Sequence, residues 1–201
     1  MAAATAPEIL PALGLLERAI LPGSRCCVAL TSVSAYGAAR EAARGDSAVL
    51  AVFSASGGGD RPDALAEVGV LASVSQLRRV RGLWLVEVRA LCPARKLELL
   101  RSDPFRIARV VAAPEGEESL EHLGALAAAV QGAVLRLPPA EVCGTVRRRL
   151  RGAAPWELPG LVMPLLDDVP WTAWQEVLET DTVGERLAFV LACLGSRRDR
   201  R

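Results

Sequence analysis

The residues best suited to acid–base catalysis are scarce in this chain. His122 is the only histidine and Lys96 the only lysine among 201 residues. His122 lies in an acidic segment that favours the start of a helix, and no Gly-x-Ser-x-Gly motif accompanies it. Lys96 could act only beside a serine, but the alternating pattern around it predicts a strand residue whose ammonium faces solvent. We therefore predict that neither residue is catalytic and that the chain is not an enzyme.

The sequence also lacks the spacings that hold phosphates and metals. No lysine follows a glycine, so the phosphate-binding motif G-x-x-x-x-G-K-[ST] is absent. The glycines at 57–59 favour a flexible loop over a phosphate cradle. Asp167 and Asp168 have no histidine or cysteine near them in sequence and suit the approach to a helix at Pro170. We expect no metal and no cofactor.

Cysteine usage and hydropathy predict a cytoplasmic protein. The five cysteines are odd in number and include no C-x-x-C pair, so we interpret them as small buried hydrophobic residues; they are Cys26, Cys27, Cys92, Cys143 and Cys193. The N-terminus has no basic residue ahead of its apolar part, unlike a secretory signal. The longest weakly polar run, Leu123 to Leu135, has 13 residues, fewer than the roughly 20 that span a bilayer. No membrane partner is expected.

The arginines supply the candidate binding residues. The net charge is only +1, so no overall field draws the chain to nucleic acid. Arg78, Arg79 and Arg81 cluster beside Trp84, and large aromatic residues dominate interface energetics. These four residues are the predicted protein-binding site. The alternatives are that Trp84 is a core residue of a hairpin and that the arginines only solvate a turn; a second cluster at 147–151 suits a helix C-terminus.

The first half of the chain reads as strands. The segments "RCCVALT", "SAVLAVFS", "ARKLELL" and "FRIARVVAA" are strand-like, and "VSAYGAAREAARG" favours a helix closed by Gly45. In the segment 67–91, alternating apolar residues flank Arg81-Gly82, which predicts an antiparallel hairpin with one apolar face. About six strands with short connections predict a curled sheet or barrel.

The second half reads as helices. The residues from Leu120 to Leu135 suit one helix, and Pro139 suits the first turn of another. Thr172-x-x-Gln175 and Thr182-x-x-Glu185 have the spacing of capping boxes, and a helix after the second box carries one apolar stripe. We therefore predict an α+β chain with a β-rich domain at 1–113 and a helical bundle at 114–201 that ends in a frayed basic tail.

Read in order, these segments resemble the N-terminal substrate-binding domain of Lon proteases. "ILPALGLLERAILPG", "RPDALAEVGVLASVSQL" and "RGLWLVEVRALCPARKLEL" are similar to the family's successive motifs, and "DPFRIARVVAAPE" and "DTVGERLAFVLACL" to its later strand and last helices. The resemblance spans about residues 9–195. Leu21, Cys27, Ala90 and Pro93 depart from the family's usual residues, which points to an altered binding surface.

The resemblance implies a fold, a function and partners. The fold would be a β-rich pseudo-barrel related to PUA domains, followed by a helical bundle. The function would be that of a stand-alone LON domain, non-catalytic, which binds exposed segments of unfolded or partly folded polypeptides, or a partner protein, as an adaptor, scaffold or regulator in protein quality control. The alternative is an RNA-binding module that uses a PUA-like surface and the arginines, although nucleic acid is the less expected partner. Weak self-association is left open.

Overall fold

The computed structural model describes residues 6–16, 18–45, 49–55, 65–113, 116, 118–138, 140–166 and 168–199. The chain divides into two compact units, Met1–Pro114 and Glu115–Arg201. The first holds the strands and one helix, and the second holds the remaining helices. The predicted α+β fold class, with strands before helices, is confirmed.

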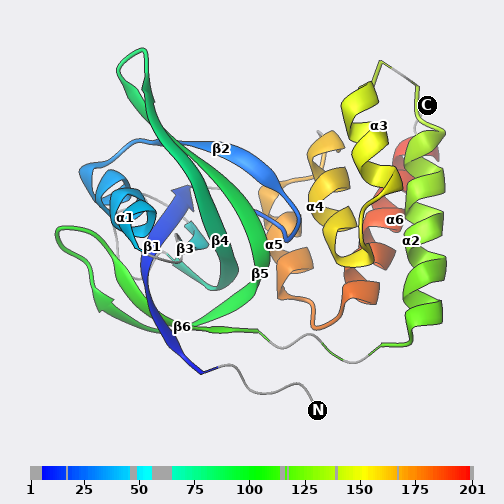
Figure 1. Ribbon diagram of the computed structural model, residues 1–201. Coiled ribbons are helices and arrows are strands. Elements are labelled where there is room, and N and C mark those ends of the chain that lie inside the picture. Colours follow the sequence, from blue (N-terminus) through cyan, green and yellow to red (C-terminus); the bar gives the residue numbers. More distant parts are fainter. Residues whose placement is uncertain are drawn as a thin grey trace. The chain divides into compact units, whose positions relative to one another are not determined.

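The first unit is built on six strands, shown in Figure 1. They are β1 (Glu8–Leu16), β2 (Arg25–Leu30), β3 (Val49–Ala55), β4 (Leu65–Val80), β5 (Leu83–Arg101) and β6 (Ile107–Ala112). Their order is β2-β5-β4-β3-β1-β6, and β5 also pairs with β6. The additional pairing closes five strands into a barrel, with β2 attached to β5 outside the closed ring. A closed barrel removes most of the open edges at which other strands could pair.

Strand β5 is the central element of this unit. Its 19 residues pair with β4 along most of their length, with β2 near the beginning and with β6 near the end. The segment "ARKLELL", predicted as a separate strand, is therefore the last part of β5. Pro93 does not interrupt the strand, because register shifts on either side bend it around the barrel.

The core of the barrel forms around Phe53, which is fully buried. Leu10, Leu65 and Val110 pack in the same cluster. Gly69 lies directly against Phe53, and a methyl group at Gly69 would approach the Phe53 ring to 2.5 Å and overlap the Val52 carbonyl. The close contact between strands β3 and β4 therefore requires a glycine at this position.

Helix α1 (Val33–Arg44) packs on the barrel through small side chains. Ser32 caps its first turn by accepting the backbone N–H of Ala35 at 3.0 Å. The buried alanines Ala38, Ala39 and Ala42 form the face that meets β1, β3 and β4. The prediction of this helix, ending at Gly45, is confirmed.

The second unit is helical. Its elements are α2 (Leu120–Leu135), α3 (Gly144–Arg151), η2 (Pro155–Glu157), α4 (Leu158–Val162), η3 (Met163–Leu165), α5 (Trp171–Glu179) and α6 (Val183–Asp199). Helix α2 has the predicted bounds. The predicted capping box at the start of α6 is confirmed, since the Thr182 hydroxyl accepts the Glu185 N–H at 3.2 Å and the Glu185 carboxylate accepts the Thr182 N–H at 3.3 Å.

One strand was missed and two predictions about helix starts were wrong. The strand β1 was not predicted, because Pro11 and Gly14 hide its alternation. The helix after α2 begins at Gly144 rather than at Pro139, which lies outside the described residues. Thr172 lies inside α5, and Gln175 bonds to Glu179 at 2.7 Å instead of closing a capping box. The predicted glycine loop at 57–59 also lies outside the described residues.

Candidate binding surface

The predicted hairpin is confirmed, and its end forms an arm. Pairing between β3 and β4 ends at Ser73, so the hairpin continues past β3 as two paired strands, with β2 alongside β5. We call residues 76–87 the arm; in Figure 1 it projects from the barrel. Arg81 and Gly82 have φ angles of 49° and 87°, the left-handed pair of a type I′ turn.

A bulge at Ser75 separates the arm from the barrel. Val74 pairs with Val88 and Gln76 with Glu87, which leaves Ser75 as the extra residue of β4. Its hydroxyl donates to the Glu87 carbonyl at 3.1 Å. Because the bulge adds one residue to β4, the side chains after it alternate out of step with those before it. The next apolar residue after Val74 is therefore Leu77, three positions on, rather than Gln76, two positions on.

The arm has an inner and an outer face, set by the strand register. Arg79 lies opposite Trp84 and Leu77 opposite Val86 on the inner face. Arg78 lies opposite Leu85 and Val80 opposite Leu83 on the outer face. Directly opposite residues of an antiparallel pair point to the same side of the sheet. The predicted cluster of arginines is thus divided between two faces, with Arg81 in the turn.

Trp84 is held on the inner face by a second aromatic ring. The ring centroids of Trp84 and Tyr36 of α1 are 4.6 Å apart, with the planes tilted by 37°. Trp84 is half-buried and also lies opposite Leu30 of β2. Such tilted aromatic pairs stabilise the packing of their elements. The contact fixes the arm to α1 near its turn; a direct role of Trp84 in binding stays a prediction.

The outer face carries apolar side chains in solvent. Leu83 is 55% exposed and Val80 is 37% exposed, and half-buried Leu85 continues the same face along β5. Ala29 and Cys27 of β2 lie beside this face, opposite Leu85 and Glu87, and both are exposed. Sequence reasoning singled out the charged and aromatic residues of the arm and missed this aliphatic surface, although alternation around the turn contains it.

Other exposed leucines mark bulges in β5. Leu91, Leu97 and Leu100 each lie at a register shift and are 37%, 49% and 38% exposed. A bulge turns its extra residue away from the regular alternation. Beside Leu97, Glu98 pairs with Arg109 of β6 at 3.0 Å. No local pattern in the sequence predicts these bulges, because they depend on the partner strand.

The candidate catalytic residues do not meet. His122 is exposed in the first turn of α2. The ammonium of Lys96 donates to the Leu65 carbonyl at 2.8 Å, so the prediction that it faces solvent was wrong. Across the part of the chain that the structure describes, no three histidine, cysteine or acidic side chains gather as they would around a metal ion.

The cysteines are less buried than predicted. Cys27 and Cys143 are exposed, the other three are half-buried, and all five are free thiols. The interpretation of all five as buried hydrophobic residues was therefore wrong. Burial, reinforced by the neighbouring Cys27 and opposed by Arg18, raises the pKa of the Cys26 thiol from 9.0 to about 11. Such a thiol is a weak nucleophile at neutral pH.

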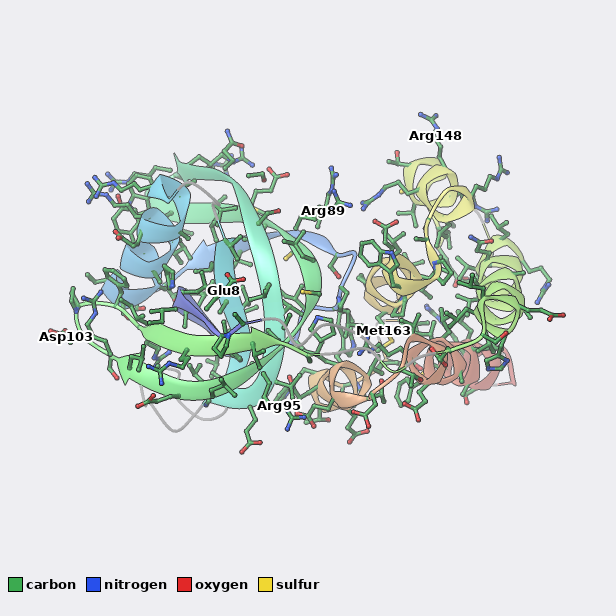
Figure 2. All side chains as sticks on the ribbon, turned by 60° about the horizontal axis from the view of Figure 1, so that its bottom comes forward. Glu8, Arg89, Arg95, Asp103, Arg148 and Met163 are labelled. Atoms are coloured by element: carbon green, nitrogen blue, oxygen red, sulfur yellow. The ribbon has the colours of Figure 1, made fainter. Side chains whose placement is uncertain are left out.

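One arginine of the α3 cluster, Arg147, binds the end of a neighbouring helix. Arg148, Arg149 and Arg151 lie in the last turn of α3 before Gly152, as predicted. Arg147 precedes that turn and instead reaches the end of α2. Its guanidinium donates to the carbonyls of Leu135, Leu137 and Val142. The first two carbonyls lie in and just after the last turn of α2, and the third lies just ahead of α3. Arg148 and Arg149 are exposed, and Figure 2 shows Arg148 projecting away from the helix.

A small polar cavity lies near the start of α1. It has a volume of about 180 Å³, and its lining includes Gly14, Thr31, Ser34 and the buried guanidinium of Arg106. The Ser32 hydroxyl on its wall already accepts the Ala35 N–H. Sequence reasoning gave no signal for this cavity. None of the helices in the described segments is long and apolar enough to cross a bilayer.

The comparisons with known proteins give a structural match without a sequence match. No model of a protein family and no curated protein matches the sequence. Among solved structures, the N-terminal domain of the Mycobacterium avium complex Lon protease is similar at a TM-score of 0.75 and 22% identity, over 94% of this chain and 98% of that one. A Lon N-terminal domain protein from Xanthomonas campestris is similar at 0.61 and 17% identity, over 92% and 98%. The chain has the fold of the N-terminal domain of Lon proteases.

Proposed function

We propose that this protein binds exposed segments of other polypeptides, without enzymatic activity, as an adaptor, scaffold or regulator in protein quality control. One observation carries the proposal. Val80 and Leu83 lie opposite each other at the end of the arm and are exposed to solvent. Apolar side chains held in solvent at the tip of a projecting hairpin contribute little to the core and suit contact with another chain.

The edge of the arm offers a second element of recognition. Beyond Ser73, no strand among the described residues pairs with the β4 edge that faces away from β5. An extended segment could pair there through its backbone, which tolerates many sequences, and place apolar side chains against Val80 and Leu83. Arg78 and Arg79 of the same strand would disfavour basic segments and keep the edge from pairing with a second copy. This mode of binding fits unfolded polypeptides of varied sequence.

The fold supports the same function by resemblance. The similar structures are Lon N-terminal domains, and the sequence resemblance to the substrate-binding domain of Lon proteases implies recognition of polypeptides. Fold alone does not fix function, so the arm rather than the resemblance is the part of the proposal that a substitution can test.

RNA binding is the competing function and has less support. Arg78 and Arg79 point to opposite faces, so one nucleic acid strand would meet only part of the cluster. The ring of Trp84 is already packed on Tyr36, whereas stacking with a base requires an accessible ring face.

A salt series distinguishes the two functions. The measurement is the fluorescence anisotropy of a labelled, carboxymethylated polypeptide that cannot fold, and of a labelled structured RNA. If the three arm arginines each bind a phosphate, affinity falls roughly 40-fold between about 50 and about 200 mM salt. Polypeptide capture through Val80 and Leu83 keeps its affinity nearly constant, because apolar contacts are not screened. Binding of the RNA alone, with the steep dependence, would contradict the proposal.

A further inference from the structure

The helical unit contains a groove that the arm does not involve. Its volume is about 700 Å³, within the range of pockets that bind ligands or side chains. It is lined by the ends of α2 and α6 and by the residues that follow α2, namely Ala133, Arg136, Leu137, Pro138, Leu191, Leu194, Gly195 and Arg197. In Figure 1 the ends of α2 and α6 lie together at the same end of this unit.

The floor of the groove is apolar. Ala133 lies in the last turn of α2 and Leu137 follows that helix, while Leu191 and Gly195 are four residues apart on α6. An apolar groove at the ends of two helices can accept the apolar face of an amphipathic helix. Ala133 and Gly195 are small, which leaves room in the groove. A methyl group added at Gly195 would meet no atom within 4 Å.

The rim of the groove is basic. Arg136 is exposed, and Arg197 donates to the Leu165 carbonyl and lies 3.7 Å from the Glu141 carboxylate. Arg147 stands close by, on the carbonyls of Leu135 and Leu137. Among the described residues that line the groove none is acidic. A partner of matching charge would carry carboxylates beside its apolar residues.

We propose that this groove binds an amphipathic helix of another polypeptide, with leucine-like residues on one stripe and acidic residues along its border. The apolar stripe packs between Leu137 and Leu191, and a carboxylate on the border pairs with Arg136. The segment 197–201 does not fit this description, because it holds four arginines and one aspartate. The groove shares no residue with the arm. It would bind a helical segment, whereas the arm would bind an extended one.

The test uses a labelled peptide and a pair of matched glycine substitutions. The peptide has about 16 residues, enough for a stable helix, with leucines at i, i+3, i+4 and i+7 and flanking glutamates. Gly195→Leu fills the groove, whereas Gly124→Leu places the same side chain in open space near the start of α2. Both variants replace a helical glycine by a better helix former. We expect Gly195→Leu to weaken binding at least about ten-fold and Gly124→Leu to leave it within about two-fold.

A charge exchange tests the role of the rim. Arg136→Glu should weaken the glutamate peptide and strengthen an otherwise identical peptide with lysines in place of the glutamates. Equal binding of both peptides by the unaltered chain would overturn the acidic partner. Unchanged binding in Gly195→Leu would overturn the groove as the site.

Two further measurements separate this inference from the proposed function. Leu83→Asp on the arm should leave peptide binding unchanged. If it abolished peptide binding while Gly195→Leu did not, the peptide would bind at the arm, and only the inference would fail. If sedimentation showed a dimer of the unaltered chain that Gly195→Leu dissolved, the groove would be an interface between two copies, which also overturns the inference.

Discussion

Removing the two exposed aliphatic side chains of the arm should weaken polypeptide binding without destabilising the fold. The variant is Val80→Ser with Leu83→Ser. Full burial of a valine or leucine side chain is worth about 1.5 to 3 kcal/mol. Because 37% of Val80 and 55% of Leu83 remain exposed in the free protein, the part that a bound segment could still cover is worth about 2 kcal/mol for the pair.

The corresponding change in affinity is measurable. At about 1.4 kcal/mol for each factor of ten in Kd, the upper limit is roughly 25-fold, and incomplete coverage by the ligand reduces the expected loss to about ten-fold. Stability should change little, since both residues are exposed and serine is tolerated at the end of a strand. The assay is anisotropy of the unfolded polypeptide, with urea unfolding measured on the same samples.

The control is another exposed leucine. Leu120 is 87% exposed at the start of α2 and lies outside the arm. Leu120→Ser should leave the Kd unchanged. If the double variant of the arm also kept its Kd while unfolding at the same urea concentration as the unaltered protein, the arm would not be the binding surface.

Three other perturbations test the account of stability and reactivity. Gly69→Ala should destabilise the protein by about 3 kcal/mol or more, because the added methyl overlaps the Val52 carbonyl and the Phe53 ring. The control is Gly152→Ala, where the added methyl meets nothing. Equal urea midpoints for the two variants would contradict the prediction. Arg147→Met should cost about 2 kcal/mol by leaving three carbonyls unbonded, and Arg148→Met, at an exposed neighbour, should cost almost nothing; equal losses would refute the role of Arg147 at the end of α2. The pKa of Cys26 is raised to about 11 in the folded protein, whereas the unfolded thiol ionises near 9. The free energy of unfolding should therefore fall as the pH rises from 9 to 11. Cys26→Ser should remove this fall, and a free energy of unfolding that depends on pH in the same way in both proteins would count against the burial of this thiol.

The local elements of this protein could be predicted where the chain carries strong local signals. The turn at Arg81-Gly82 and the reciprocal cap of Thr182 and Glu185 depend on residues within three positions of each other. The alanine-rich helix α2 was likewise predicted with its bounds. These features require no knowledge of distant partners, because their hydrogen bonds are local.

The surface of the arm and the roles of single side chains could not be predicted in the same way. The bulge at Ser75 decides which residues share a face with Trp84, and it depends on pairing with Glu87 across the hairpin. Glu118 precedes α2 in the chain, but its carboxylate accepts the N–H of Gly184 at 2.7 Å, 66 positions away. A carboxylate at the first turn of α6 stabilises the helix, yet only the tertiary fold brings Glu118 to that turn.

The uninterrupted course of β5 has a mechanical consequence for anything held at the arm. One strand runs from the turn at Gly82 to Arg101 and is bonded in succession to β4, β2 and β6. The bonds of antiparallel pairs stand perpendicular to the strands, so tension applied along β5 loads many of them at once in shear. The barrel should therefore resist unfolding when a polypeptide bound to the arm is under tension along β5.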